Sequence, residues 1–241
     1  MEILQSQYIE DIAIIMPKLS ALVALLLFVP AFSIGVLMSL FIAPGLVGNS
    51  VFTAVKIWGI AFPLFWVMKT NSKALRLPKF RWVEVKAGLA LGMIMFAAIA
   101  LAYISVGQQV IDLPEIRAKA SEVGITKPYL YLVGCIYWSF INSLVEELTW
   151  RGFVVSQLKE LVSPSIAVVL AALFFTVHHS LALYGYTHNW VVVALGSLGV
   201  FVAGLVWAWC YNHYRSVTSG YISHILADLA IAIIGYQLLF G

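Results

Sequence analysis

The sequence predicts an all-helical protein that crosses a membrane as a bundle of about seven helices. Of its 241 residues, 62% are hydrophobic and only 10% are charged, whereas soluble domains carry about 25% charged residues. Long apolar runs recur along the whole chain, and a helix needs roughly 20 such residues to cross a bilayer. Strands of a membrane β-barrel would alternate over about ten residues instead. Helices therefore explain the pattern better than a barrel does.

Seven apolar runs can be delimited. They cover residues 19–42, 51–68, 87–105, 129–158, 165–183, 190–211 and 217–240. Because no internal repeat and no separate soluble stretch interrupts them, we expect residues 1–241 to form a single integral membrane domain.

The loop over residues 69–86 indicates the orientation in the membrane. It carries six cations and one acid (Lys69, Lys73, Arg76, Lys79, Arg81 and Lys86 against Glu84). Positive residues mark cytoplasmic loops, so this loop and, two spans earlier, the N-terminus are expected in the cytoplasm. A net charge of +3 gives no sign of a nucleic-acid partner, and Cys135 and Cys210 form no metal-binding or disulfide pattern.

Three of the eleven carboxylates lie inside apolar runs, namely Glu146, Glu147 and Asp228. A charged Asp at the centre of a membrane helix costs about 2.5–3.5 kcal/mol on insertion scales, and such residues usually mark function. The first four runs hold no comparable group before Glu146 except Lys56, which we expect near a membrane edge.

The two adjacent glutamates differ in their local partners. Glu147 and Arg151 are four residues apart, on one helical face, and can pair. Glu146 points about 100° away and is left without a local cation. A buried carboxylate without a partner binds a proton readily, which suits a general base. Taken alone, the cluster could equally be a structural ion pair that locks two helices together.

Histidines follow in two later runs. His178 and His179 lie in the fifth, and His224 and Asp228 share one helical face in the seventh. Glu146 precedes Val162 by sixteen residues and His178 follows it by sixteen, so in an antiparallel pair of helices they reach a similar depth. A carboxylate and an imidazole at one level can share a water molecule. His224 matches that depth less well.

These residues resemble the three motifs of the CAAX-protease and bacteriocin-processing family, also called Abi. The motifs are Glu-Glu-x-x-x-Arg, Phe-x-x-x-His and His-x-x-x-Asn or Asp. They are represented here by Glu146, Glu147 and Arg151, by Phe174 and His178, and by His224 and Asp228. The resemblance covers residues 129–241, where we expect all the catalytic motifs.

The family implies a bundle of about eight membrane helices and an intramembrane endopeptidase. By the resemblance, Glu146 and His178 activate the attacking water, and His224 and Asp228 stabilise the oxyanion. Glu147, Arg151, Phe174 and His179 would support them. Asp228 replaces the asparagine of many members, and it must be protonated to donate a hydrogen bond. Phe175 with His179 fits the second motif as well as Phe174 with His178 does, and the depth count favours His178.

The sequence is compatible with a zinc-dependent reaction and with a metal-free one. Glu146, His178 and His224 could ligate zinc with a water in the fourth position. The clusters contain no His-Glu-x-x-His zinc helix, and we favour a metal-free reaction without a cofactor. A transporter or scaffold that uses the buried Glu and His residues is the rival from another functional class.

The family resemblance also limits the kinds of substrate to be expected. It implies a peptide or protein substrate with a membrane-proximal or C-terminal cleavage site, reached within the lipid bilayer. Prenylated C-terminal peptides, bacteriocin leaders and C-terminal sorting signals all fit. The short chain favours the inner membrane of a prokaryote.

Overall fold

The structure, a computed structural model, describes residues 2–70 and 81–241, with side chains from Ile15 onward. These residues form helices and no strand. Seven helical stretches are long and apolar enough to cross a membrane, and each overlaps one of the predicted runs. They are Ile15–Ile42, Leu46–Thr70, Trp82–Val110, Pro128–Leu161, Pro164–Thr187, Trp190–Tyr214 and Thr218–Phe240. The prediction of a polytopic all-helical bundle is confirmed.

Most spans are single helices. These are α1 (Glu2–Leu37), α2 (Leu46–Thr70), α9 (Pro164–Thr187), α10 (Trp190–Tyr214) and α11 (Thr218–Phe240). The first span ends in the π-helical segment η1 (Met38–Ile42). The third span joins α3 (Trp82–Ala102), the π-helical segment η2 (Tyr103–Gly107) and α4 (Gln108–Val110).

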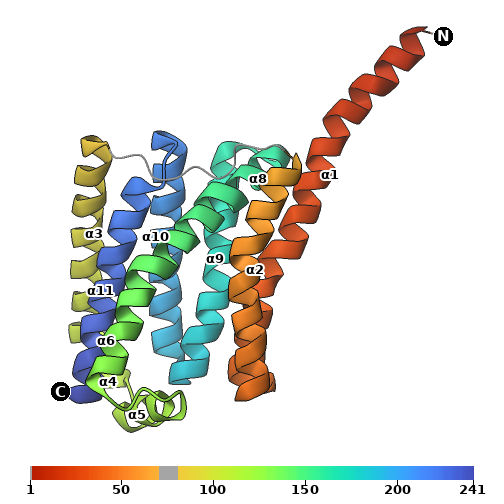
Figure 1. The fold of residues 1–241 in the computed structure, drawn as a ribbon. Helices are drawn as coiled ribbons and strands as arrows, with labels where there is room; N and C mark the ends of the chain where they lie inside the picture. Colours follow the sequence, from red (N-terminus) through yellow and green to blue (C-terminus); the bar gives the residue numbers. More distant parts are fainter. Residues whose placement is uncertain (1, 71–80) are drawn as a thin grey trace.

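The fourth span is the irregular one. It consists of α6 (Pro128–Ile136), η3 (Tyr137–Asn142), α7 (Ser143–Glu146), η4 (Glu147–Val154) and α8 (Val155–Leu161). Both η segments are π-helical, a conformation that is frequent at functional sites. The span runs obliquely across the bundle from α6 to α8 (Figure 1). Both of its glutamates lie where α7 meets η4.

Small residues set the closest helix contacts. Gly88 and Gly92 of α3 face Ile222 and Leu226 of α11, and a Cβ atom at either glycine would clash with these side chains. Gly204 of α10 lies against Ala172 of α9 in the same way. Small residues allow membrane helices to approach each other closely. The last three spans and α3 therefore form tightly packed pairs around the fourth span.

An aromatic cluster packs behind the fourth span. Phe28 and Phe32 of α1, Phe62 of α2, and Trp150 and Phe153 of η4 are all buried. Their ring centroids lie 5.1–6.2 Å apart in mostly edge-to-face pairs. This packing fixes one face of η4, so its polar residues must point into the bundle.

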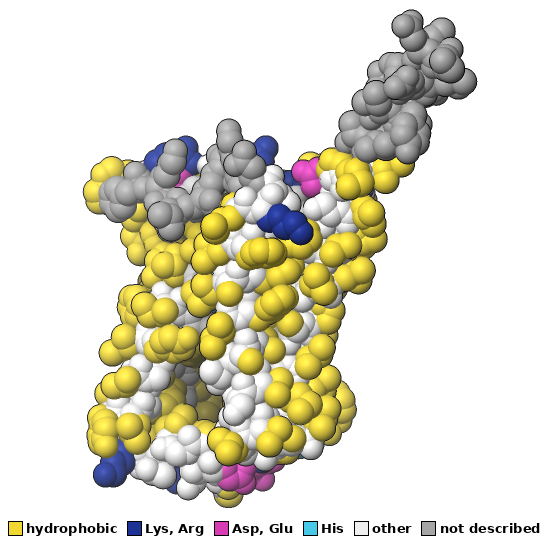
Figure 2. Space-filling view, turned by 45° about the vertical axis from the view of Figure 1, so that its right-hand side comes forward, with side chains coloured by type: hydrophobic (Ala, Val, Ile, Leu, Met, Phe, Trp, Pro, Cys, Tyr) yellow, Lys and Arg dark blue, Asp and Glu magenta, His cyan; other side chains and the backbone are white. Residues whose placement is uncertain are grey.

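The lateral surface of the bundle is mainly hydrophobic, and charged side chains gather towards its two ends (Figure 2). One loop between spans contains the helix α5 (Leu113–Glu122), which Asp112 caps by accepting a hydrogen bond from the Glu115 N–H at 3.1 Å. Of the cationic loop used for orientation, Lys73, Arg76 and Lys79 lie outside the described residues.

Candidate active site

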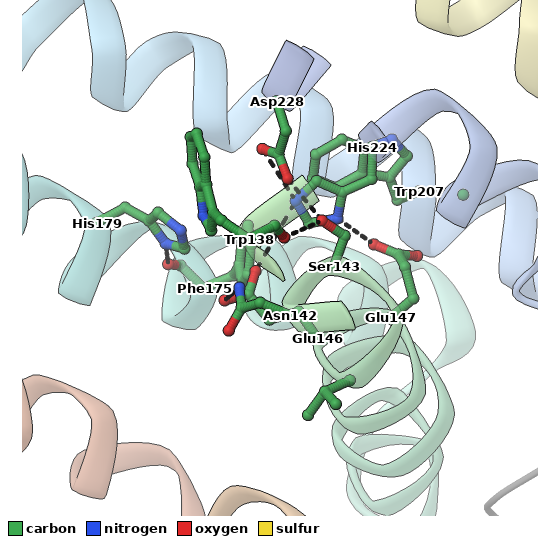
Figure 3. A network of polar contacts seen from close by, with 12 residues as sticks. Trp138, Asn142, Ser143, Glu146, Glu147, Phe175, His179, Trp207, His224 and Asp228 are labelled. Atoms are coloured by element: carbon green, nitrogen blue, oxygen red, sulfur yellow. Dashed lines mark hydrogen bonds and ion pairs between the residues drawn. The ribbon is translucent and has the colours of Figure 1, made fainter. Parts of the chain in front are cut away.

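Three spans bring the predicted polar residues together in the interior of the bundle (Figure 3). Glu146 and Glu147 come from the fourth span, the adjacent histidines from α9, and His224 and Asp228 from α11. The two glutamates, His178, His224 and Asp228 are all buried. The α2 helix adds Lys56, which the sequence analysis did not place here.

The Glu147 side of the site is fully enclosed. Arg151 Nη1 lies 3.3 Å from Glu147 Oε1, so the predicted pair is present, although the two groups are not aligned for a hydrogen bond. The Arg151 guanidinium is held between the rings of Phe175 and Trp207, at 4.3 and 4.8 Å from their centroids. Such cation–π contacts stabilise a desolvated cation. Arg151 is thus locked by packing as well as by charge.

His224 is oriented by the same carboxylate. Its Nδ1 lies 3.1 Å from Glu147 Oε1, and because a carboxylate only accepts, Nδ1 carries the donated hydrogen. The ring stacks on Trp207 with centroids 4.0 Å apart. His224 Nε2 then faces Glu146 Oε2 and Asp228 Oδ1, each at 3.8 Å. The poorer depth match expected for His224 does not keep it from the site, because the fourth span is tilted (Figure 1).

Glu146 has partners that the sequence analysis did not identify. Asn142 Nδ2 donates a hydrogen bond of 2.8 Å to Glu146 Oε1. Lys56 Nζ donates to Asn142 Oδ1 at 2.8 Å and lies 3.8 Å from Glu146 Oε1. Among the described residues, the ion pair of Glu146 with a lysine or arginine involves no local cation of the fourth span, as expected, but Lys56 of α2. The spacing of four between Asn142 and Glu146 was the available sequence signal.

The placement of Lys56 near a membrane edge is corrected. The α2 helix begins at Leu46 rather than at the predicted Val51, so Lys56 lies ten residues, or about 15 Å, from the start of the helix. The segment Gly48-Asn49-Ser50 lies outside the predicted run of residues 51–68, yet it is helical. Lys56 therefore lies well inside the α2 helix rather than close to its start.

The two neighbouring histidines differ in their contacts. His178 stacks on Trp150, with centroids 5.3 Å apart and planes 16° from parallel, and its Nδ1 has no hydrogen-bond partner among the described residues. His179 Nδ1 lies 2.8 Å from the Phe175 carbonyl oxygen. That oxygen can only accept, so Nδ1 carries the hydrogen and Nε2 is free to accept one.

The second motif is ambiguous in sequence, and the packing distinguishes its two readings. Phe175 is buried and contacts Arg151 and His224, whereas Phe174 is partly buried and packs against the hydrophobic core. The contacts thus favour Phe175 with His179 over Phe174 with His178.

Asp228 is held by a serine that the sequence analysis did not identify. Ser143 Oγ lies 2.5 Å from Asp228 Oδ2 and 3.0 Å from the Trp138 carbonyl oxygen. A hydroxyl has one hydrogen to donate, and a carbonyl oxygen cannot donate in return. Both contacts are satisfied together if Asp228 carries a proton that it donates to Ser143. The geometry therefore suits a protonated Asp228. This is the form that can donate a hydrogen bond, as the asparagine of many family members does.

The side chains as arranged do not fit a zinc ion. Zinc ligands converge at about 2.0–2.3 Å from the metal. Within residues 2–70 and 81–241, no three His, Cys, Asp or Glu side chains are grouped to hold a metal ion. His224 and Glu146 approach each other to 3.8 Å, but in that same part of the chain no ion pair joins Glu146 to either histidine of α9.

Comparison with known proteins identifies one match. Residues 128–230, from the start of α6 to Ala230 in α11, match the family described as type II CAAX prenyl endopeptidase Rce1-like. This region contains all three motifs of the site. Searches among curated proteins and among solved structures gave no match.

Proposed function

We propose that this chain, which belongs through residues 128–230 to the CAAX-protease and bacteriocin-processing family, hydrolyses a peptide bond with a water molecule that Glu146 activates. The family consists of intramembrane endopeptidases, so the chain is of the peptidase class. One observation supports Glu146 as the base more than any other. Its Oε1 is occupied by Asn142, whereas its Oε2 faces His224 Nε2 across 3.8 Å.

In the proposed reaction, Glu146 Oε2 takes a proton from water while the water oxygen bonds to the carbonyl carbon of the substrate. The electrons of the carbonyl π bond move to the carbonyl oxygen, which becomes an oxyanion. Breaking of the C–N bond restores the carbonyl, and Glu146 returns its proton to the leaving amine. We propose His179 as the second residue that contacts this water, because its Nε2 is free to accept a hydrogen bond.

The oxyanion would bind between His224 and Asp228. His224 has its Nδ1 hydrogen bonded to Glu147, so it donates from Nε2 in the imidazolium form. Asp228 has one proton to donate in its protonated form, and when substrate binds that proton would go to the oxyanion instead of to Ser143. Donors fixed in advance around a developing charge are worth about 2.7–4 kcal/mol each in known oxyanion holes.

We propose a metal-free reaction, because the donor set does not fit zinc as it stands. Purified protein should keep its activity after dialysis against excess chelator, and added zinc should not raise it. A zinc-dependent enzyme that uses Glu146, His178 and His224 would instead lose activity in chelator and regain it with zinc.

The substrate is proposed to be a protein or peptide whose cleavage site lies near the membrane or the C-terminus, as in lipidated, leader-bearing or C-terminally sorted proteins. The proposed location is a prokaryotic inner membrane with the N-terminus in the cytoplasm. Proteomics of cells lacking the chain tests this directly. Uncleaved precursors should accumulate and disappear again when the wild-type gene, but not Glu146→Gln, is restored.

The same experiment separates a peptidase from a transporter or scaffold. If no precursor accumulates, or if Glu146→Gln restores processing fully, the proposed function is excluded.

A further inference from the structure

Lys56 is a charged side chain in the middle of a membrane span. It lies ten residues into α2, which begins at Leu46 and ends at Thr70. A Lys at the centre of a membrane helix costs about 2.5–3.5 kcal/mol on insertion scales, and such residues usually mark function. Its Nζ lies 5.5 Å from the centroid of Phe52, one turn earlier on the same helix, so the chain holds the ammonium group at a defined position.

The contacts of Lys56 define the orientation of a neighbouring amide. An ammonium group only donates hydrogen bonds, so Asn142 must turn Oδ1 towards Lys56 Nζ, at 2.8 Å. The amide nitrogen of Asn142 is then directed to Glu146 Oε1, also at 2.8 Å. The result is a linear series of donors from Lys56 through Asn142 to one oxygen of Glu146.

We propose that Lys56 is a positioning residue that selects Glu146 Oε2 as the reactive oxygen. By fixing the Asn142 amide, it occupies Oε1 and leaves Oε2 facing His224 Nε2 at 3.8 Å. Lys56 also places a positive charge 3.8 Å from Oε1, which counters the negative charge that Glu146 and Glu147 bring into one buried site. This inference rests on the proposed function, in which Glu146 is the base.

A second role for Lys56 would be to bind the terminal carboxylate of a substrate. In a peptide cut three residues before its C-terminus, those three residues span about 10 Å in an extended chain. Lys56 Nζ is only 3.8 Å from the proposed base. It is therefore too close to the reacting bond for that role.

The test uses a fluorogenic peptide that contains the cleavage site of the precursor found in cells lacking the chain. Purified Lys56→Met should lower kcat by about 10²-fold, the loss typical of a misplaced catalytic group, and leave KM within about twofold. Lys56→Arg should recover part of that loss because it still donates to Asn142. Lys69→Met is the matched control, since Lys69 lies near the end of the same helix and should keep wild-type kinetics.

Asn142→Ala provides the second arm. If Lys56 acts through Asn142, the double variant Lys56→Met, Asn142→Ala should be no slower than the slower single variant. Multiplicative losses would show independent roles and overturn the proposal. So would a kcat for Lys56→Met within about threefold of wild type, or an effect on KM alone, which would assign Lys56 to substrate binding.

Failure of the two proposals can be told apart. A wild-type protein that cleaves the peptide, together with an inactive Glu146→Gln and an unimpaired Lys56→Met, removes only the role of Lys56. Cells in which no precursor accumulates remove the peptidase function, and the positioning role with it.

Discussion

The two glutamates at the junction of α7 and η4 are adjacent in sequence, yet their surroundings differ. Glu147 is fully buried and contacts a cation on its own helix, Arg151, and an imidazole from α11, His224. Glu146 retains some exposure and reaches its cation, Lys56, on another span through the amide of Asn142. Both contacts of Glu147 involve Oε1, and its Oε2 is buried without a hydrogen-bond partner among the described residues. Glu146 retains some exposure, so its Oε2 can meet water.

This difference separates structural from chemical roles within a single turn of helix. A buried ion pair that loses one partner leaves an uncompensated charge, which is costly. A carboxylate that is hydrogen bonded through one oxygen can be changed to an amide of the same shape at little structural cost. We therefore expect changes at Glu147 and Arg151 to affect folding, and changes at Glu146 to affect the reaction.

The largest expected effect is at Glu146. Glu146→Gln keeps the acceptor for Asn142 and removes the base, so kcat/KM should fall by about 10³–10⁴-fold, or about 4–5.5 kcal/mol. The thermal unfolding midpoint should stay within a few degrees of wild type. Glu147→Gln is the matched control, and it should lower the midpoint clearly. Normal cleavage by a well-expressed Glu146→Gln protein would show that Glu146 is not the base and that the two glutamates do not differ in this way.

Arg151→Ala should give the largest stability effect. It leaves Glu147 buried with His224 as its remaining partner and removes the guanidinium that packs between Phe175 and Trp207. Breaking a buried pair costs about 3–5 kcal/mol. Yield in detergent and the unfolding midpoint should both fall, and activity with them. An Arg151→Ala protein as stable as wild type would contradict the structural role of the pair.

The next largest expected effect distinguishes the two adjacent histidines. We expect His179→Ala to lower kcat by about 10²-fold, the lower range for loss of an acid–base group. His178→Ala should mainly lower stability, because it removes a ring stacked on Trp150. Measuring kcat and unfolding for both variants decides between the two motif readings. The reverse pattern would restore the assignment to His178 that the depth count favours.

The spans could be predicted from sequence because the bilayer imposes length and apolarity on every helix. The fourth span was expected at residues 129–158 and covers Pro128–Leu161. The short helix α5 was not predicted. It lies in a loop, where no membrane constraint applies and only its Asp112 cap and Pro114 mark its start.

The sequence predicts which types of residue form the site better than it predicts which of these residues are in contact. A pattern along one helix reveals pairs such as Glu147 with Arg151, which share a face. It does not reveal which helices are neighbours, so Lys56 of α2 was not connected with Glu146. Ser143 and Asn142 are ordinary polar residues in sequence, and their role emerges only where the span turns them towards Asp228 and Glu146.

The depth count favours His178 and the contacts favour His179, and the two criteria differ for a related reason. The count assumed upright, regular α-helices with a rise of about 1.5 Å per residue. The fourth span is oblique (Figure 1) and includes two π-helical segments, and successive residues on α9 differ in direction by about 100°. Depth alone cannot resolve two neighbours whose difference is mainly one of direction.

The smallest expected effect is at Asp228, and it sharpens the comparison by testing a third carboxyl group that we expect to be neutral. If Asp228 donates a proton to Ser143, then Asp228→Asn can place its amide nitrogen in the same position and let Ser143 donate to the Trp138 carbonyl. Activity should stay within about threefold of wild type, or below about 0.7 kcal/mol. Asp228→Ala, the control, leaves Ser143 and His224 without this partner and should lose at least about tenfold. A large loss in Asp228→Asn would mean that the site needs a negative charge at this position, so that Asp228 would belong with Glu147 as a charged partner of His224.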